Sequence, residues 1–248
     1  MNTNPPSEAK IFFFDLLFPR RCLGCAELLS DYSAAQLCRP CWKQLEFKGD
    51  FACAFCSAPV VLGKTCPFCR RDGRQLDRLL VAADYNEPLV EKSLKAFKYK
   101  FVRSLGEDIA HWLCSYLEKN NLLVRVFAED IPLLVPVPLH RRRLNWRGCN
   151  QSALLAESIA KYFNWPLQTD LLKRSRNQPP QAEIKNRLER VQRMQGMFSC
   201  TSSAAVTNKT VLLLDDVSTT GSTLEDCARA LKGAGAKAVV ALVLARNR

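Results

Sequence analysis

Four Cys-x-x-Cys pairs lie within one short stretch of the chain, between residues 22 and 69. A Cys-x-x-Cys turn brings two sulfurs to the same side, and two such turns complete the tetrahedral four-thiolate shell that Zn²⁺ prefers. Because closed shells leave no coordination position for a substrate, we expect two structural zinc ions. The expected ligands are Cys22, Cys25, Cys38, Cys41, Cys53, Cys56, Cys66 and Cys69.

Other uses of paired cysteines fit this chain less well. The short apolar stretch at residues 11–14 is accompanied by Glu8 and Asp15 rather than by a basic region and a cleavage site, so it does not read as a signal peptide. We therefore expect a cytoplasmic protein, in which disulfides rarely persist. A redox function needs one such pair, not four. Adjacent pairs are the favoured partners for each metal, although three pairings are open.

The net charge of +12 is distributed unevenly along the 248 residues. Residues 138–198 carry 12 basic and 4 acidic side chains, a net +8. Such a window favours a polyanion or a phosphate-bearing ligand, although a solvated basic face gives the same pattern. The N-terminal window contributes less, because ionised thiolates around two Zn²⁺ would lower the total to about +8.

The chain beyond the cysteines has the pattern of an α/β domain. Apolar spacing predicts helices at 87–97, 105–117 and 152–163, and apolar or β-branched runs predict strands at 210–214 and 238–244. The apolar, proline-containing stretch 131–139 predicts a short strand that opens into a constrained loop. We expect a leader at 1–20, a double zinc ribbon at 21–74 and the α/β domain at 75–248. No apolar run approaches the roughly 20 residues that cross a bilayer, so no membrane contact is expected.

The stretch from Thr210 to Thr223 is the most informative part of this domain. An apolar strand ends in Asp215 and Asp216, and five of the next six residues after Val217 carry hydroxyl groups. Gly221 interrupts them where the backbone must approach something closely. A helix then begins near residue 222, so its dipole and the exposed amides of the turn predict an anion site at the end of the strand.

The commoner phosphate loops are excluded, since neither GxxxxGK[ST] nor GxGxxG is present. Adjacent carboxylates would repel a phosphate, so they should face sugar hydroxyls or a Mg²⁺ ion. An ordinary strand–turn–helix with a capped N-terminus is the simpler alternative, but it needs fewer hydroxyl side chains than this turn has.

These residues resemble a known signature. The run from Asp215 to Thr223 resembles the phosphoribosyl pyrophosphate (PRPP) motif of type I phosphoribosyltransferases, DD-x-x-TTG-x-T. Three further segments agree with the ComF family (ComFC and GntX-like proteins) of bacterial competence, which also has an N-terminal cysteine array. They are the block from Val135 to Gln151, Phe97-Lys98-Tyr99, and Gln181 with Arg190 and Phe198.

The resemblance implies a type I phosphoribosyltransferase-like parallel sheet flanked by helices and preceded by the zinc ribbon. It implies that Asp215 and Asp216 hold the ribose hydroxyls as the catalytic pair, with Mg²⁺ accompanying PRPP. The remaining PRPP-binding residues would be Ser218, Thr219, Thr220, Gly221, Ser222 and Thr223 at the 5′-phosphate, and Arg143 and Arg147 at the pyrophosphate.

Three functions follow from this reading. The first is a factor of natural transformation that binds PRPP and meets single-stranded DNA or a DNA-processing protein, with Arg141, Arg142 and Trp146 on the DNA. Phe47, Phe51, Phe55 and Phe68 near the zinc ligands could also stack on bases, although a role in a small core of the ribbon is favoured. The second is a phosphoribosyltransferase of nucleotide salvage, acting by positioning and charge stabilisation. The third is a regulator that uses PRPP as an effector.

Overall fold

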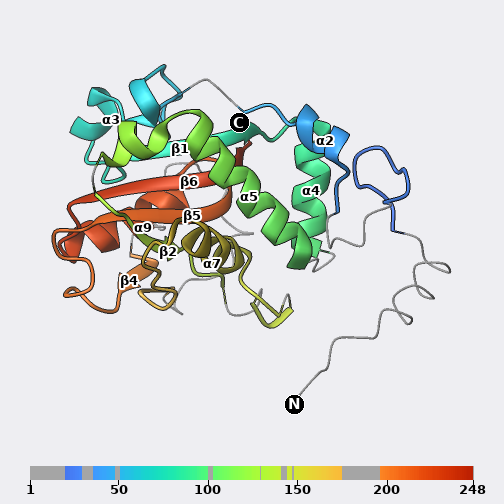
Figure 1. Cartoon of the computed structure of the whole chain (residues 1–248). Helices are drawn as coiled ribbons and strands as arrows, with labels where there is room; N and C mark the ends of the chain where they lie inside the picture. The colour runs from blue at the N-terminus through green and yellow to red at the C-terminus, as the bar shows by residue number, and fades with distance from the viewer. Residues whose placement is uncertain are drawn as a thin grey trace, which may run out of the picture.

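The computed structural model describes residues 20–29, 36–47, 51–99, 103–128, 130–140, 144–146, 148–174 and 196–247. A four-stranded parallel sheet forms its centre (Figure 1). Its strands, in order across the sheet, are β1 (Arg78–Asp84), β6 (Ala238–Arg246), β5 (Thr210–Ser218) and β2 (Leu133–Pro136). The predicted leader at 1–20 lies outside the described residues, apart from Arg20.

The two central strands are covered on both faces. Their register pairs Leu212 with Val240 and Leu214 with Leu242. Side chains of a strand alternate between the faces, so Leu212 packs into one core and its neighbour Leu213 into the other. Burial on both faces explains why the sequence of these strands is apolar almost without interruption.

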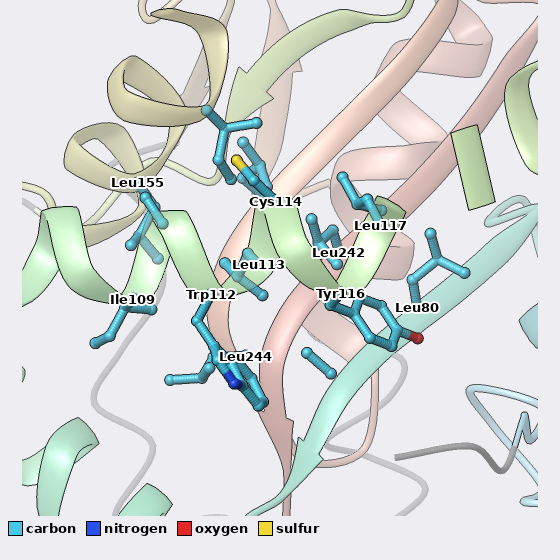
Figure 2. Close-up of a cluster of buried hydrophobic side chains, with 14 of the residues drawn as sticks. Leu80, Ile109, Trp112, Leu113, Cys114, Tyr116, Leu117, Leu155, Leu242 and Leu244 are labelled. Carbon is cyan, nitrogen blue, oxygen red and sulfur yellow. The ribbon is translucent and has the colours of Figure 1, made fainter. Parts of the chain in front are cut away.

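Helices α4 (Pro88–Tyr99), α5 (Arg103–Lys119) and α7 (Gln151–Phe163) cover one face, and α9 (Ser222–Gly233) covers the other (Figure 1). Figure 2 shows the first core, where Leu113 and Leu117 of α5 lie beside Leu242 of β6. All the predicted helices and the strands at 210–214 and 238–244 are confirmed. The expected parallel sheet flanked by helices and preceded by a cysteine-rich region is thus present.

One strand of the central sheet differs from the sequence-based expectation. Strand β1 was not predicted, because Arg78–Asp84 is a short apolar run whose pattern does not separate a strand from a loop after a charged linker. The short strand predicted within 131–139 is confirmed as β2, and the chain beyond it is a loop, since prolines at 132 and 138 lack the N–H group that a longer ladder needs.

The remaining elements are short. They are α2 (Arg39–Gln44), η1 (Val61–Gly63), α3 (Pro67–Arg71), η2 (Leu123–Phe127), and the antiparallel pair β3 (Leu172–Arg174) and β4 (Phe198–Cys200). Within the described ranges, no helix combines the length and apolar character needed to cross a membrane.

The cysteine-rich region packs on both cores of the domain. The ring centroid of Phe47 lies 4.9 Å from that of Trp112 in α5, and Phe51 packs against the same core. Phe55 packs on the opposite core, beside α9. Phe68 is 71% exposed. The prediction that these phenylalanines form a small core of the ribbon is therefore wrong for Phe47 and Phe51, because both pack against the core of the α/β domain.

Candidate functional site

Two cysteine tetrads are present, and each is built from adjacent Cys-x-x-Cys pairs. Cys22, Cys25, Cys38 and Cys41 form the first tetrad, and Cys53, Cys56, Cys66 and Cys69 form the second. In each tetrad all four sulfurs lie within 4.8 Å of one another. The favoured pairing is thereby confirmed.

The geometry of both tetrads fits Zn²⁺. The Cys25 and Cys38 sulfurs lie 3.7 Å apart, and the Cys56 and Cys66 sulfurs 3.5 Å apart. Four sulfurs at about 2.3 Å from a tetrahedral Zn²⁺ lie about 3.8 Å from one another, so each tetrad is close to the required size. With four thiolates and no open position, such a metal ion would support folding and take no part in a reaction.

Backbone N–H groups stabilise the thiolate form of one buried ligand in each tetrad. Burial raises the pKa of Cys22, but backbone hydrogen bonds, led by that of Cys38, outweigh it and lower this pKa to about 6. Burial likewise raises the pKa of Cys53, and backbone hydrogen bonds led by that of Cys56 lower it to about 6. Since metal binding requires deprotonated cysteine, these amides favour metal capture at neutral pH.

The predicted anion site lies where strand β5 ends and helix α9 begins. We call residues Ser218–Thr223 the phosphate loop. Gly221 is the N-cap of α9 and has a φ of +74°, a left-handed conformation that glycine adopts without strain. The hydroxyl groups of Thr220 and Ser222 contact each other in the loop, and Thr219 and Thr220 are exposed. The predicted strand–turn–helix geometry is confirmed.

Asp215 is half-buried near the carboxyl end of β5. Its Oδ1 accepts hydrogen bonds from the Ser152 hydroxyl at 3.0 Å and from the Asp216 backbone amide at 2.9 Å. Burial, followed by the negative charge of Asp216, raises the pKa of Asp215 to about 7. The carboxyl is thus poised to exchange a proton near neutral pH.

Asp216 forms an ion pair with a lysine that is distant from it in the sequence. Its Oδ2 lies 3.2 Å from Nζ of Lys98 in α4, and the two side chains are 13% and 22% exposed. The sequence analysis included Lys98 in a matching segment but did not assign it to the site. No local sequence pattern links Lys98 to this acidic pair, so the sequence held no signal for the contact.

Ser152 was also missed by the sequence analysis. It lies in the first turn of α7, where the Asn150 side chain caps the helix by accepting from the Ser152 amide. The Asn150 Nδ2 also donates to the Val137 carbonyl at 3.0 Å, which ties the start of α7 to the end of β2. This cap places the Ser152 hydroxyl beside Asp215.

The first turn of α9 is fixed by two buried carboxylates. Glu225 accepts from the backbone amides of Gln75 and Leu76, with distances between 2.9 and 3.1 Å. Asp226 accepts from the amides of Gly196 and Met197 at 2.8 and 2.7 Å. Helix α9 is therefore held by hydrogen bonds to Gln75 and Leu76, which follow the second tetrad in the chain, and to Gly196 and Met197, which precede β4.

Removing the Glu225 carboxylate is expected to destabilise the protein. Glu225→Ala leaves the Gln75 and Leu76 amides without their partner, and Leu76 is fully buried. Unsatisfied buried groups cost about 1–3 kcal/mol each, so we expect a loss of about 2–4 kcal/mol, measured by urea unfolding. The control is Glu91→Gln, which breaks an exposed pair with Lys95 and should change stability by less than about 0.5 kcal/mol.

Several predicted site residues lie outside the described residues. These are Arg141, Arg142, Arg143 and Arg147, and their predicted roles stay predictions. Trp146 is described and is 62% exposed. Ser218 is buried, and its carbonyl accepts from the Asn247 amide at 3.0 Å.

Comparisons with known proteins agree with this geometry. The model of the phosphoribosyl transferase domain matches residues 150–248, and that of the double zinc ribbon domain matches residues 13–70. The zinc ribbon match and the two tetrads together support structural zinc.

Three curated relatives match most of the chain. Competence protein F of Haemophilus influenzae is 28% identical over 92% of this chain and 98% of its own length. DNA utilization protein YhgH of Salmonella typhi is 32% identical over 73% of this chain and 78% of its own length. Competence protein ComFC of Bacillus subtilis is 26% identical over 83% of this chain and 81% of its own length.

Proposed function

The chain belongs to the ComF family of competence and DNA-utilization proteins, and from this we propose that it acts on DNA taken up by the cell. We propose that its phosphoribosyltransferase-like domain binds PRPP with Mg²⁺ and that its basic surface binds single-stranded DNA. Cytoplasmic location and a DNA-processing protein as a further partner are part of the same proposal.

The observation that carries the PRPP proposal is the acidic pair near the carboxyl end of β5, separated from the phosphate loop by Val217 alone. In an open parallel sheet, ligands bind at this end of the strands. The ribose hydroxyls would donate to Asp215 and Asp216, and the loop amides at the start of α9 would hold the 5′-phosphate. Lys98, held beside Asp216, would supply positive charge near the same ligand.

The pyrophosphate would be held by residues that surround this pair. We propose Arg143 and Arg147 for this role, because they belong to the basic window at 138–198. Mg²⁺ bound with PRPP would neutralise part of the pyrophosphate charge.

The DNA proposal is supported by one exposed aromatic side chain that lies within the basic stretch of the sequence. Trp146 is 62% exposed and stands among the arginines of the basic window. Single-stranded DNA is bound by a positive surface with aromatic platforms on which bases stack. Arg141 and Arg142 would contact its backbone.

One titration series tests the proposal. Calorimetry of the full zinc-loaded chain with PRPP and Mg²⁺, with and without a single-stranded 20-mer, should show one PRPP site and a separate DNA site. With two or three phosphate contacts, DNA affinity should fall at least about tenfold between 50 and 300 mM salt. Absence of PRPP binding would overturn the first half of the proposal, and DNA affinity that is absent or insensitive to salt would overturn the second.

The same samples decide whether transfer occurs. Release of pyrophosphate from PRPP with an added purine, pyrimidine or amine would identify a phosphoribosyltransferase. Binding of PRPP without turnover across this set would favour a non-catalytic role.

A further inference from the structure

The first turn of the second tetrad, Cys53-Ala54-Phe55-Cys56, lies directly against the phosphate loop. A Cβ atom on Gly221 would lie 3.3 Å from the Ala54 carbonyl oxygen and 3.6 Å from Cε1 of Phe55. Ala54 is fully buried, and Phe55 packs on the core beneath α9. The sequence analysis expected Gly221 to permit a close approach, and this turn of the ribbon is one of its neighbours.

Arg246 fastens this turn to the sheet. It is the last residue of β6 and only 6% exposed, and its two terminal nitrogens donate to the carbonyls of Cys53 at 3.1 Å and Ala54 at 2.6 Å. Across the β5–β6 ladder, Arg246 stands opposite Ser218, the first residue of the phosphate loop. One guanidinium therefore joins the metal-binding turn to the strand that flanks the loop.

The second pair of ligands in this tetrad is connected to the loop by another route. Cys66 and Cys69 bracket the start of α3, and Arg70 of that helix donates to the Leu76 carbonyl at 3.2 Å. The Leu76 amide in turn donates to Glu225 in the first turn of α9. Both halves of the second tetrad are thus linked to the ends of the phosphate loop.

The first tetrad has different neighbours. Among the described residues, its surroundings include Leu89 at the start of α4, which would lie 3.1 Å from a Cβ on Gly24. The backbone amide of Gln36, near this tetrad, donates to Asp108 of α5 at 3.1 Å. The two tetrads are chemically alike, but the first adjoins α4 and α5, whereas the second adjoins the phosphate loop.

We propose that metal bound at the second tetrad, acting through Arg246 as a positioning residue, holds the phosphate loop in its conformation and thereby sets its affinity for the phosphate end of PRPP. The part that concerns affinity rests on the proposed PRPP function. Because such coupling is reciprocal, PRPP would also raise the metal affinity of the second tetrad and not that of the first.

Matched cysteine variants test this coupling. Cys56→Ser and Cys25→Ser each remove the exposed second cysteine of a first pair, one in each tetrad. Without ligand, Cys56→Ser should raise the amide hydrogen exchange of residues 218–223 at least about tenfold, whereas Cys25→Ser should leave it unchanged. By calorimetry, Cys56→Ser should weaken PRPP binding at least about tenfold, and Cys25→Ser less than about twofold.

A third variant separates coupling from unfolding of the ribbon. Arg246→Gln should retain two zinc ions by metal analysis and still raise exchange in residues 218–223, while Arg246→Lys, which keeps a cationic donor, should restore part of the protection. Equal effects of the two cysteine variants on this exchange, or no effect of Arg246→Gln, would overturn the inference. If the wild-type chain fails to bind PRPP, the proposed function fails, and the exchange comparison alone decides whether the metal holds the loop.

Discussion

Replacing Asp216 with asparagine is expected to weaken binding of PRPP with Mg²⁺ by about 100-fold. Hydrogen bonds to a charged group contribute about 1.5–3 kcal/mol, so losing the carboxylate toward two ribose hydroxyls costs about 3 kcal/mol, or two decades of affinity. The substitution also leaves Lys98, 3.2 Å from Asp216, without its carboxylate partner beside the ligand. Calorimetric titration of the Asp216→Asn variant measures the change.

The fold should survive this substitution, because asparagine removes the negative charge that opposes ionisation of Asp215. We expect a melting temperature equal to or above that of the wild type at pH 8. The matched control is Asp170→Asn, an exposed aspartate, which should bind PRPP as the wild type does. Wild-type PRPP affinity in the Asp216→Asn variant would contradict the proposal that the acidic pair binds the ligand.

Features with a local origin could be predicted from the sequence. The tetrads follow from cysteine spacing within single turns, and strand β5, the phosphate loop and α9 are contiguous in the chain. The turn at Gly221 was predicted for the same reason, since its neighbours in sequence define it. The fully buried strands were recognisable because they must be apolar on both faces.

The remaining parts of the site depend on contacts between distant residues. Lys98 meets Asp216 only because α4 and β5 pack in one domain, and Ser152 meets Asp215 because its helix begins beside the same strand end. The contact between Arg246 and Cys53 joins residues 193 positions apart. No local period encodes such pairs, so a single sequence could not place them.

Strand β1 was missed for a related reason. Its pairing runs parallel to β6, near the far end of the chain, and Leu80 lies opposite Leu242. A parallel pair needs a long connection, so the partner of an edge strand cannot be inferred from a neighbouring turn. What defines β1 as a strand is its pairing with β6 in the folded sheet.

PRPP affinity is expected to rise steeply with pH and then level off. In the free protein the pKa of Asp215 is raised to about 7, by burial and then by the charge of Asp216. Ribose hydroxyls and Mg²⁺ favour the ionised carboxyl, so its pKa falls on binding and a proton is released. Affinity should therefore rise about tenfold per pH unit from pH 5 to 7 and change little above 7 from this group. Calorimetry in buffers of different ionisation enthalpy counts the protons.

The control must separate Asp215 from the titration of PRPP itself. Asp215→Asn removes the protein component and keeps that of the ligand, so its pH profile should be shallower by about one proton. The raised pKa also has a consequence for stability without ligand: the contribution of Asp215 is fully present below its ordinary pKa of 3.8 and is lost as pH rises through about 7. Asp215→Asn should accordingly raise the melting temperature more at pH 8 than at pH 5. Identical pH profiles for the two proteins would show that Asp215 stays in one protonation state during binding.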